Sequence, residues 1–297
     1  MRDYDAVGES VPVLASRTAR ALSSLALFAT ALVVSIPAYA GLQSQTLTLV
    51  YRVGLPALLG VLAFTATRTE RLKPFAPVLW SFFGVSLGLC LAYIVDDRPL
   101  HILGLSVAAP KGAAVAKLTE AVPICAAIFL TTFAAGRGID SLSIRRGRLR
   151  LSLGLGVLSA VPLLAFLILV PGTGAEELRA VPAATVISWL PWIVLFSVAN
   201  GFMEELWFRG SWFGAFRELL GPAAAMHVTS LAFSMWHVVV YWSQPAALSV
   251  LWPVFLYLGY ACVLIVRKTG SLWGAVLGHV LVDVMFVLAA FAGSGVA

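Results

Sequence analysis

The chain has 297 residues, of which 60% are hydrophobic and only 11% are charged. A soluble domain usually has about 25% charged residues, so this composition excludes a water-soluble globular protein and indicates one that crosses a membrane several times. The net charge of +6 then reflects basic loops at one membrane face rather than a nucleic-acid-binding surface.

Nine apolar segments are each close to the ~20 residues that cross a ~30 Å hydrocarbon layer. In chain order they cover residues 21–40, 48–67, 75–95, 115–135, 151–170, 184–206, 222–242, 246–266 and 272–292. The second is the weakest, because Arg52 interrupts it. Around the sixth, residues 182–217 can form one long helix or two, with Gly210 and Gly214 near the bend. We therefore predict an all-α fold, a polytopic transmembrane helical bundle of about eight to nine spans.

Basic residues concentrate in alternate loops between these segments. They are Arg2, Arg17 and Arg20, then Arg68, Arg71 and Lys73, then Arg137, Arg145, Arg146, Arg148 and Arg150, and last Arg217, Arg267 and Lys268. The positive-inside rule predicts a cytoplasmic N-terminus and an external C-terminus. Short loops favour a bacterial plasma membrane, so we expect an integral membrane protein surrounded by membrane lipid, with no nucleic-acid partner. The first segment ends in Ala38-Tyr39-Ala40, which imitates a signal cleavage site, but its length predicts an uncleaved helix.

Embedded polar residues divide the chain into two predicted parts. Residues 1–150 contain no cluster of carboxylates and histidines inside a span, and we predict N-terminal transmembrane helices there. Glu120 falls near a helix end in this part and is interpreted as an interface residue. Residues 151–297 hold all of the embedded polar motifs. His227 is close to a helix start and is interpreted as a packing residue.

Three polar motifs interrupt the late apolar segments. They are Glu204-Glu205-x-x-x-Arg209, Phe233-x-x-x-His237 and His279-x-x-x-Asp283. An ionisable group at mid-bilayer costs at least ~2.5–3.5 kcal/mol, so such residues are expected to serve a shared function.

Helical spacing predicts how these residues are arranged. Glu205 and Arg209 are four residues apart and can pair, whereas Glu204 lies ~100° around the helix and can face a cavity as a general base. His279 and Asp283 project from one helix face. Gly274 and Gly278 precede them and allow a second helix to approach closely.

In this order on late membrane helices, the three motifs resemble those of the CAAX-protease and bacteriocin-processing family, also called the CPBP or Abi family. The resemblance covers about residues 185–292. It implies an intramembrane endopeptidase, which makes residues 151–297 a CPBP-like catalytic transmembrane domain. Convergence on one site requires His237 to lie within ~12 Å of Glu204, because both must reach one reacting group.

The resemblance also implies a role for each motif residue. Glu204 is expected to activate water, His237 to position that water, and Glu205 with Arg209 to order the site. His279 and Asp283 are expected to stabilise the oxyanion. The prenyl-protein proteases have Asn where this chain has Asp283, and an ionised aspartate cannot donate a hydrogen bond. Asp283 must therefore be protonated, orient His279 or bind a metal.

The sequence leaves the cofactor and the function class open. Two histidines with a carboxylate are a familiar zinc ligand set, so Glu204, His237 and His279 are the candidates for a divalent metal such as zinc. The single-helix His-Glu-x-x-His arrangement is absent, which favours a glutamate mechanism without a cofactor. We expect hydrolysis of a peptide bond in a membrane-associated protein or peptide, in a cavity opening towards the cytoplasm. The alternatives are a non-catalytic scaffold or bacteriocin-immunity protein of the same fold, and a proton-coupled transporter.

Overall fold

A computed structural model describes residues 16–170, 175–240 and 245–294. The regular structure in this part of the chain is helical, without strands. The α-helices are α1 (Arg17–Ala40), α2 (Gln45–Arg68), α3 (Ala76–Val95), α4 (Arg98–Leu103), α5 (Pro110–Ala134), α6 (Leu149–Leu169), α7 (Ala175–Ala180), α8 (Ala183–Glu205), α9 (Phe213–Leu220), α10 (Pro222–Val240), α11 (Pro245–Thr269) and α12 (Trp273–Gly293). Two 3-10 turns, η2 (Lys73–Phe75) and η3 (Ile139–Leu142), and one π-helical segment, η4 (Leu206–Trp212), complete them.

Eight helical stretches of the described residues are long and apolar enough to cross a membrane, which confirms the predicted polytopic helical bundle. Of the two alternatives for residues 182–217, the structure has the long one, because α8, η4 and α9 form one continuous 38-residue stretch, Ala183–Leu220. The expected span at 222–242 corresponds to the helix α10, Pro222–Val240; residues 241 and 242 lie outside the described part. Thr229, Ser230 and Ser234 of α10 are buried.

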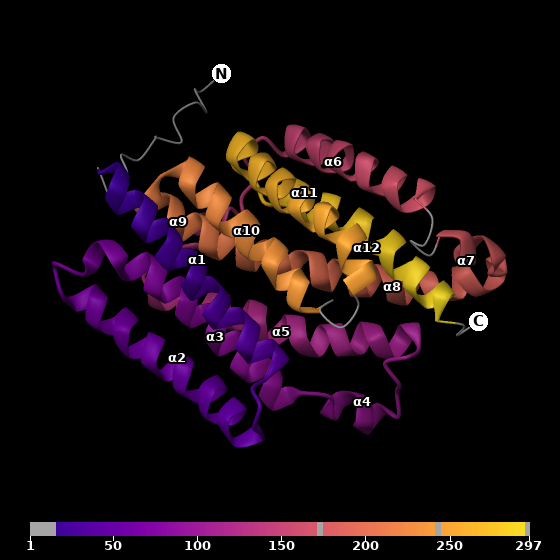
Figure 1. Cartoon of the computed structure of the whole chain (residues 1–297), viewed down its shortest axis with the longest axis horizontal. Coiled ribbons are helices and arrows are strands. Elements are labelled where there is room, and N and C mark those ends of the chain that lie inside the picture. The colour runs from indigo at the N-terminus through magenta and orange to yellow at the C-terminus, as the bar shows by residue number, and fades with distance from the viewer. Residues whose placement is uncertain (1–15, 171–174, 241–244, 295–297) are drawn as a thin grey trace.

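The basic loops gather at one end of the bundle. Arg137, after α5, forms two hydrogen bonds with Glu218 of α9, one of them 2.9 Å long. Arg145, before α6, donates to the Gly270 carbonyl at 2.8 Å, and Leu272 donates to the Ser143 carbonyl at 2.9 Å. In Figure 1 the start of α1 and the turn between α2 and α3 lie at this same end, while α4, α7 and the end of α12 lie at the other. That the basic end is cytoplasmic stays a prediction.

Glycines allow two helix pairs to approach at backbone distance. Along α3, a Cβ atom at Gly88 would lie 2.7 Å from the Cα atom of Ile124 in α5. Along α12, a Cβ atom at Gly274 would lie 1.9 Å from the carbonyl oxygen of Ser152 in α6, and one at Gly278 would lie 2.9 Å from the Gly156 carbonyl oxygen. The predicted close approach at Gly274 and Gly278 is confirmed, and the partner is α6.

Aromatic side chains fill the centre of the bundle around η4. Trp207, Phe208, Trp212 and Phe216 are fully buried, and Phe233 of α10 joins them. Phe82 of α3 contacts this cluster through Trp212 and Phe216, with ring centroids 5.5 Å away in each case. The cluster fixes the segment that follows Glu204 and Glu205. The proposed division at residue 150 stays a prediction.

Candidate active site

The buried Glu205–Arg209 ion pair supports the site from the protein interior. Nη1 of Arg209 donates to Oε1 of Glu205 at 2.9 Å, and both side chains are fully buried. Nη2 donates to the Gly259 carbonyl of α11 at 3.1 Å, and the guanidinium carbon lies 4.2 Å from the centre of the Phe233 ring. The pairing predicted from the four-residue spacing is present. A buried charge needs such a set of partners, because an unpaired one is strongly destabilising.

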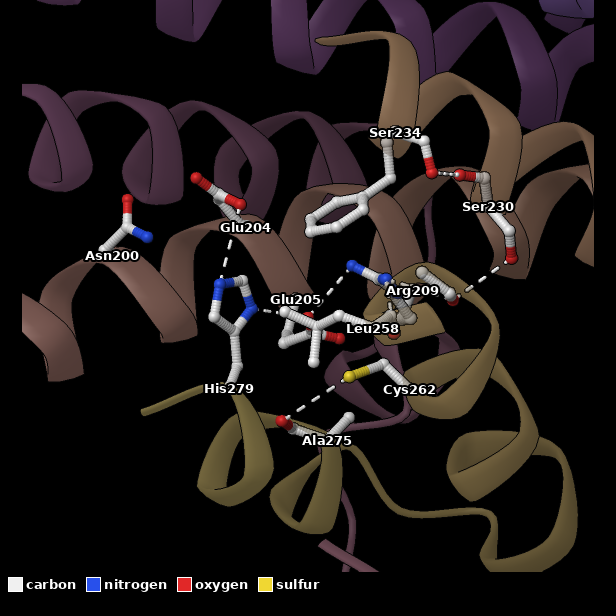
Figure 2. A network of polar contacts seen from close by, with 12 residues as sticks. Asn200, Glu204, Glu205, Arg209, Ser230, Ser234, Leu258, Cys262, Ala275 and His279 are labelled. Atoms are coloured by element: carbon white, nitrogen blue, oxygen red, sulfur yellow. Dashed lines mark hydrogen bonds and ion pairs between the residues drawn. The ribbon is translucent and has the colours of Figure 1, made fainter. Parts of the chain in front are cut away.

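His279 connects this pair to Glu204. Its Nδ1 donates to Oε1 of Glu205 at 2.8 Å, so this one oxygen accepts from both Arg209 and His279 (Figure 2). Because the acceptor is a carboxylate, Nδ1 carries a proton and Nε2 is directed at the other groups of the site. Nε2 lies 3.8 Å from Oε2 of Glu204 and 3.6 Å from Oδ1 of Asp283.

His237 approaches Glu204 from α10. Its Nδ1 donates to the Phe233 carbonyl at 2.9 Å, and its ring stacks on Phe255 with centroids 4.2 Å apart. A carbonyl only accepts, so here too Nδ1 carries a proton. Nε2 of His237 lies 3.7 Å from Oε2 of Glu204. This distance is far below the ~12 Å limit set for a single site. The three motifs therefore converge.

Glu204 stands between the two histidines in a cavity of about 250 Å³. The polar residues that line it are Lys117, Glu120, Asn200, Glu204, His237, His279 and Asp283. Oε2 of Glu204 is buried and has no hydrogen-bond partner among the described residues. A buried carboxylate oxygen directed into a cavity, with two imidazole nitrogens beyond direct hydrogen-bond distance, is suited to binding a small hydrogen-bond donor.

Three lining residues lie outside the motifs. Nδ2 of Asn200 donates to Oδ2 of Asp283 at 2.9 Å. Asn200 is one helical turn before Glu204, so its spacing could have identified it. Nζ of Lys117 donates to Oε2 of Glu120 at 2.6 Å, and their side chains are 16% and 23% exposed. Glu120 therefore lines the cavity, and its interpretation as an interface residue was wrong. A charged pair within an apolar segment was the available signal.

The cavity extends away from the basic loops. On α12 its lining continues from His279 to Val287, towards the helix end at Gly293, and on α5 it includes Lys117 and Glu120, in the first half of that helix. The end of α12 and the start of α5 both lie opposite the basic end (Figure 1). The cavity therefore extends away from the basic end, whereas we expected it to open towards the cytoplasm, the side predicted for that end. The sequence predicted the direction of each helix, but the position of the cavity depends on how the helices pack against one another.

The proposed metal ligands Glu204, His237 and His279 meet at the cavity. Within residues 16–170, 175–240 and 245–294, no group of three or more His, Cys, Asp or Glu residues is placed to hold a metal ion. Oε2 of Glu204 lies 3.7 and 3.8 Å from the two Nε2 atoms, and Asp283 is bonded to Asn200. A metal held by Glu204, His237 and His279 stays a prediction. The chemistry below uses only the protein's own groups and water.

His227 fits its interpretation as a packing residue away from the site. Its Nδ1 is 2.9 Å from the hydroxyl of Tyr260 in α11, and the two rings meet edge to face. His227 does not line the cavity around Glu204. Of the candidate histidines, the structure thus brings together only His237 and His279.

A buried carboxylate and two histidines at one intramembrane cavity define a candidate membrane hydrolase. Residues 186–285 match the family described as type II CAAX prenyl endopeptidase, Rce1-like. The match includes all seven residues named in the three motifs, so the resemblance to the CPBP family is confirmed over this region. The family indicates a membrane-embedded protease. No curated protein and no solved structure gave a significant match to the chain.

Proposed function

We propose that the protein is an intramembrane endopeptidase in which Glu204 activates water to hydrolyse a peptide bond of a membrane-associated protein or peptide. The observation that carries this proposal is the position of Oε2 of Glu204, which is buried and lies 3.7 and 3.8 Å from Nε2 of His237 and His279. These distances exceed a direct hydrogen bond but suit a water molecule that bridges the groups.

The two histidines are oriented to hold such a water. With Nδ1 of each occupied by a donated hydrogen bond, the neutral ring presents Nε2 as an acceptor. The water donates one hydrogen to Glu204 and the other to one Nε2 atom. Glu204 takes up the first proton as the water oxygen attacks the peptide carbonyl carbon. When the C–N bond breaks, Glu204 returns the proton to the leaving amine.

Glu205 and Arg209 act through His279. Their pair fixes the Nδ1 side of the imidazole, and therefore the direction of Nε2. Hydrolysis depends on this orientation, since a misplacement of ~1 Å can reduce a rate by ~10²-fold. Both residues are positioning residues in this proposal.

Asn200 is the proposed donor for the oxyanion of the tetrahedral intermediate. Its amide has two N–H groups, and the bond to Asp283 uses one of them. The second can donate to the oxyanion, in a cavity whose other groups around Glu204 are mainly acceptors. Asp283 then orients Asn200 and need not donate itself. His279 can contribute through Nε2 once it is protonated.

The test compares peptides released from membranes that contain the wild type or Glu204→Gln, with and without a metal chelator. Mass spectrometry should detect peptides that only the wild type releases, unaffected by the chelator. Glu70→Gln is the matched control, because it makes the same change at an exposed carboxylate. Release by folded Glu204→Gln would contradict the mechanism. Loss of release with chelator would favour Glu204, His237 and His279 as metal ligands, and no release by wild type would favour a scaffold.

A further inference from the structure

The route to Glu204 determines which proteins can be substrates, so this inference rests on the proposed endopeptidase activity. Two neighbouring cavities lead from the site to one end of the bundle. The first contains Glu204 and extends to Lys117 and Glu120. The second, of about 330 Å³, shares Glu120 with it and continues to Arg52, Asp96 and Asp97. Polar groups thus continue from the site to the turn between α3 and α4.

The opposite direction is filled with side chains. From Glu204 the helix continues through η4 and α9 to Leu220, 16 residues away, which corresponds to about 24 Å at 1.5 Å per residue. Over this length Trp207, Phe208 and Trp212 are fully buried and contact one another. A close-packed aromatic cluster leaves no room for a peptide to approach Glu204 from the basic end.

Loop charge indicates which end faces the cytoplasm. The clustered Lys and Arg residues lie at the end of α2 and just after it, in the loop between α5 and α6, and in the last turns of α9 and α11. Hydrogen bonds join the last three of these regions. At the other end, the α3–α4 turn has Asp96 and Asp97, and α7 has Glu176 and Glu177. Positively charged loops are retained in the cytoplasm, so the cavities open on the opposite side.

We propose that substrate and water reach Glu204 from the extracytoplasmic side of the membrane. The substrate class is then a protein segment exposed on that face, such as the external tail of a membrane protein or an exported peptide. A cytoplasmic lipid-modified tail would meet the aromatic cluster around η4 instead of the open cavity.

Thiol labelling tests the direction of the cavity without requiring activity. Cys90, Cys125 and Cys262 are replaced by Ala, and single cysteines are introduced as Val287→Cys in the cavity, Ala108→Cys in the exposed loop before α5 and Asp140→Cys at the basic end. Phe286→Cys is a second cavity position. Thermal unfolding in detergent verifies that each variant is folded. A membrane-impermeant maleimide is then applied to spheroplasts and to inverted vesicles.

The proposal expects Ala108→Cys and the cavity variants to react in spheroplasts, and Asp140→Cys to react only in inverted vesicles. It is overturned if the folded cavity variants react only in the preparation in which Asp140→Cys reacts, or if they react in neither preparation. Glu204-dependent cleavage sites should also map to extracytoplasmic segments, and sites in cytoplasmic tails would overturn it. Absence of any Glu204-dependent cleavage would instead contradict the endopeptidase proposal and leave the labelling result intact.

Discussion

The contact between α6 and α12 predicts a sharp effect of one methyl group. In Gly274→Ala, the new Cβ atom would lie 1.9 Å from the carbonyl oxygen of Ser152, whereas ordinary contact begins near 3.4 Å. The two helices must therefore separate locally by about 1.5 Å, the difference between these distances. On the other side of α12, a Cβ atom at Gly201 of α8 would already be 3.0 Å from Val280. The helix therefore has little room to move without disturbing His279.

We expect Gly274→Ala to lower the free energy of unfolding by about 1–3 kcal/mol, as overpacking does. A displacement of His279 by ~1 Å would also reduce peptide release by ~10²-fold. Thermal unfolding in detergent and the Glu204-dependent release assay measure the two effects. Gly154→Ala on α6 is the control, since nothing lies within 4 Å of its Cβ position. It should be neutral or gain up to ~1 kcal/mol from helix propensity. Wild-type stability and activity in Gly274→Ala would refute this reasoning.

Three further predictions concern polar groups. Arg209→Met should lower the free energy of unfolding by about 3–5 kcal/mol, because Glu205 would stay buried without its cation. In thermal unfolding, the double variant with Glu205→Gln should recover part of this loss. An unchanged melting temperature in Arg209→Met would contradict the role of the pair. Asn200→Ala should lower kcat by ~10²–10³-fold with little change in KM. Asp283→Asn still offers Asn200 an acceptor, so its kcat should fall less. Equal losses of kcat in the two variants would argue against Asn200 as the oxyanion donor. Glu218→Gln should change the free energy of unfolding by no more than ~1 kcal/mol, since the Arg137–Glu218 pair is partly exposed. It should leave peptide release unchanged, because neither residue lines the cavity. A large fall in the rate of release would show that the basic end contributes to the site.

Local spacing was sufficient for several parts of the site. The Glu205–Arg209 pair follows from a four-residue interval, because residues so spaced share a helix face. The close approach at Gly274 and Gly278 follows from small residues at the same interval. The polytopic fold follows from composition, because only helices or closed barrels satisfy backbone polar groups in lipid.

Contacts between helices were not available from spacing. The partner of Asn200 is Asp283 on another helix, and Glu120, interpreted as an interface residue, lines the cavity because α5 packs beside it. The sequence also left open whether residues 182–217 form one long helix or two, and the structure continues the stretch through the π-helical segment η4. Such segments are often found at functional sites, but their hydrogen-bond register is set by surrounding packing.

The sequence by itself determined that this chain is a helical membrane protein, and its three motifs identified the carboxylates and histidines that meet. Hydrophobic length and helical periodicity are local properties, so they can be read without knowing any neighbour. Only the tertiary structure decided that Glu204 lies between His237 and His279, that Asn200 holds Asp283, and that the cavity extends away from the basic loops. These features depend on which helix faces fill space against one another, and that arrangement arises from packing across the whole bundle.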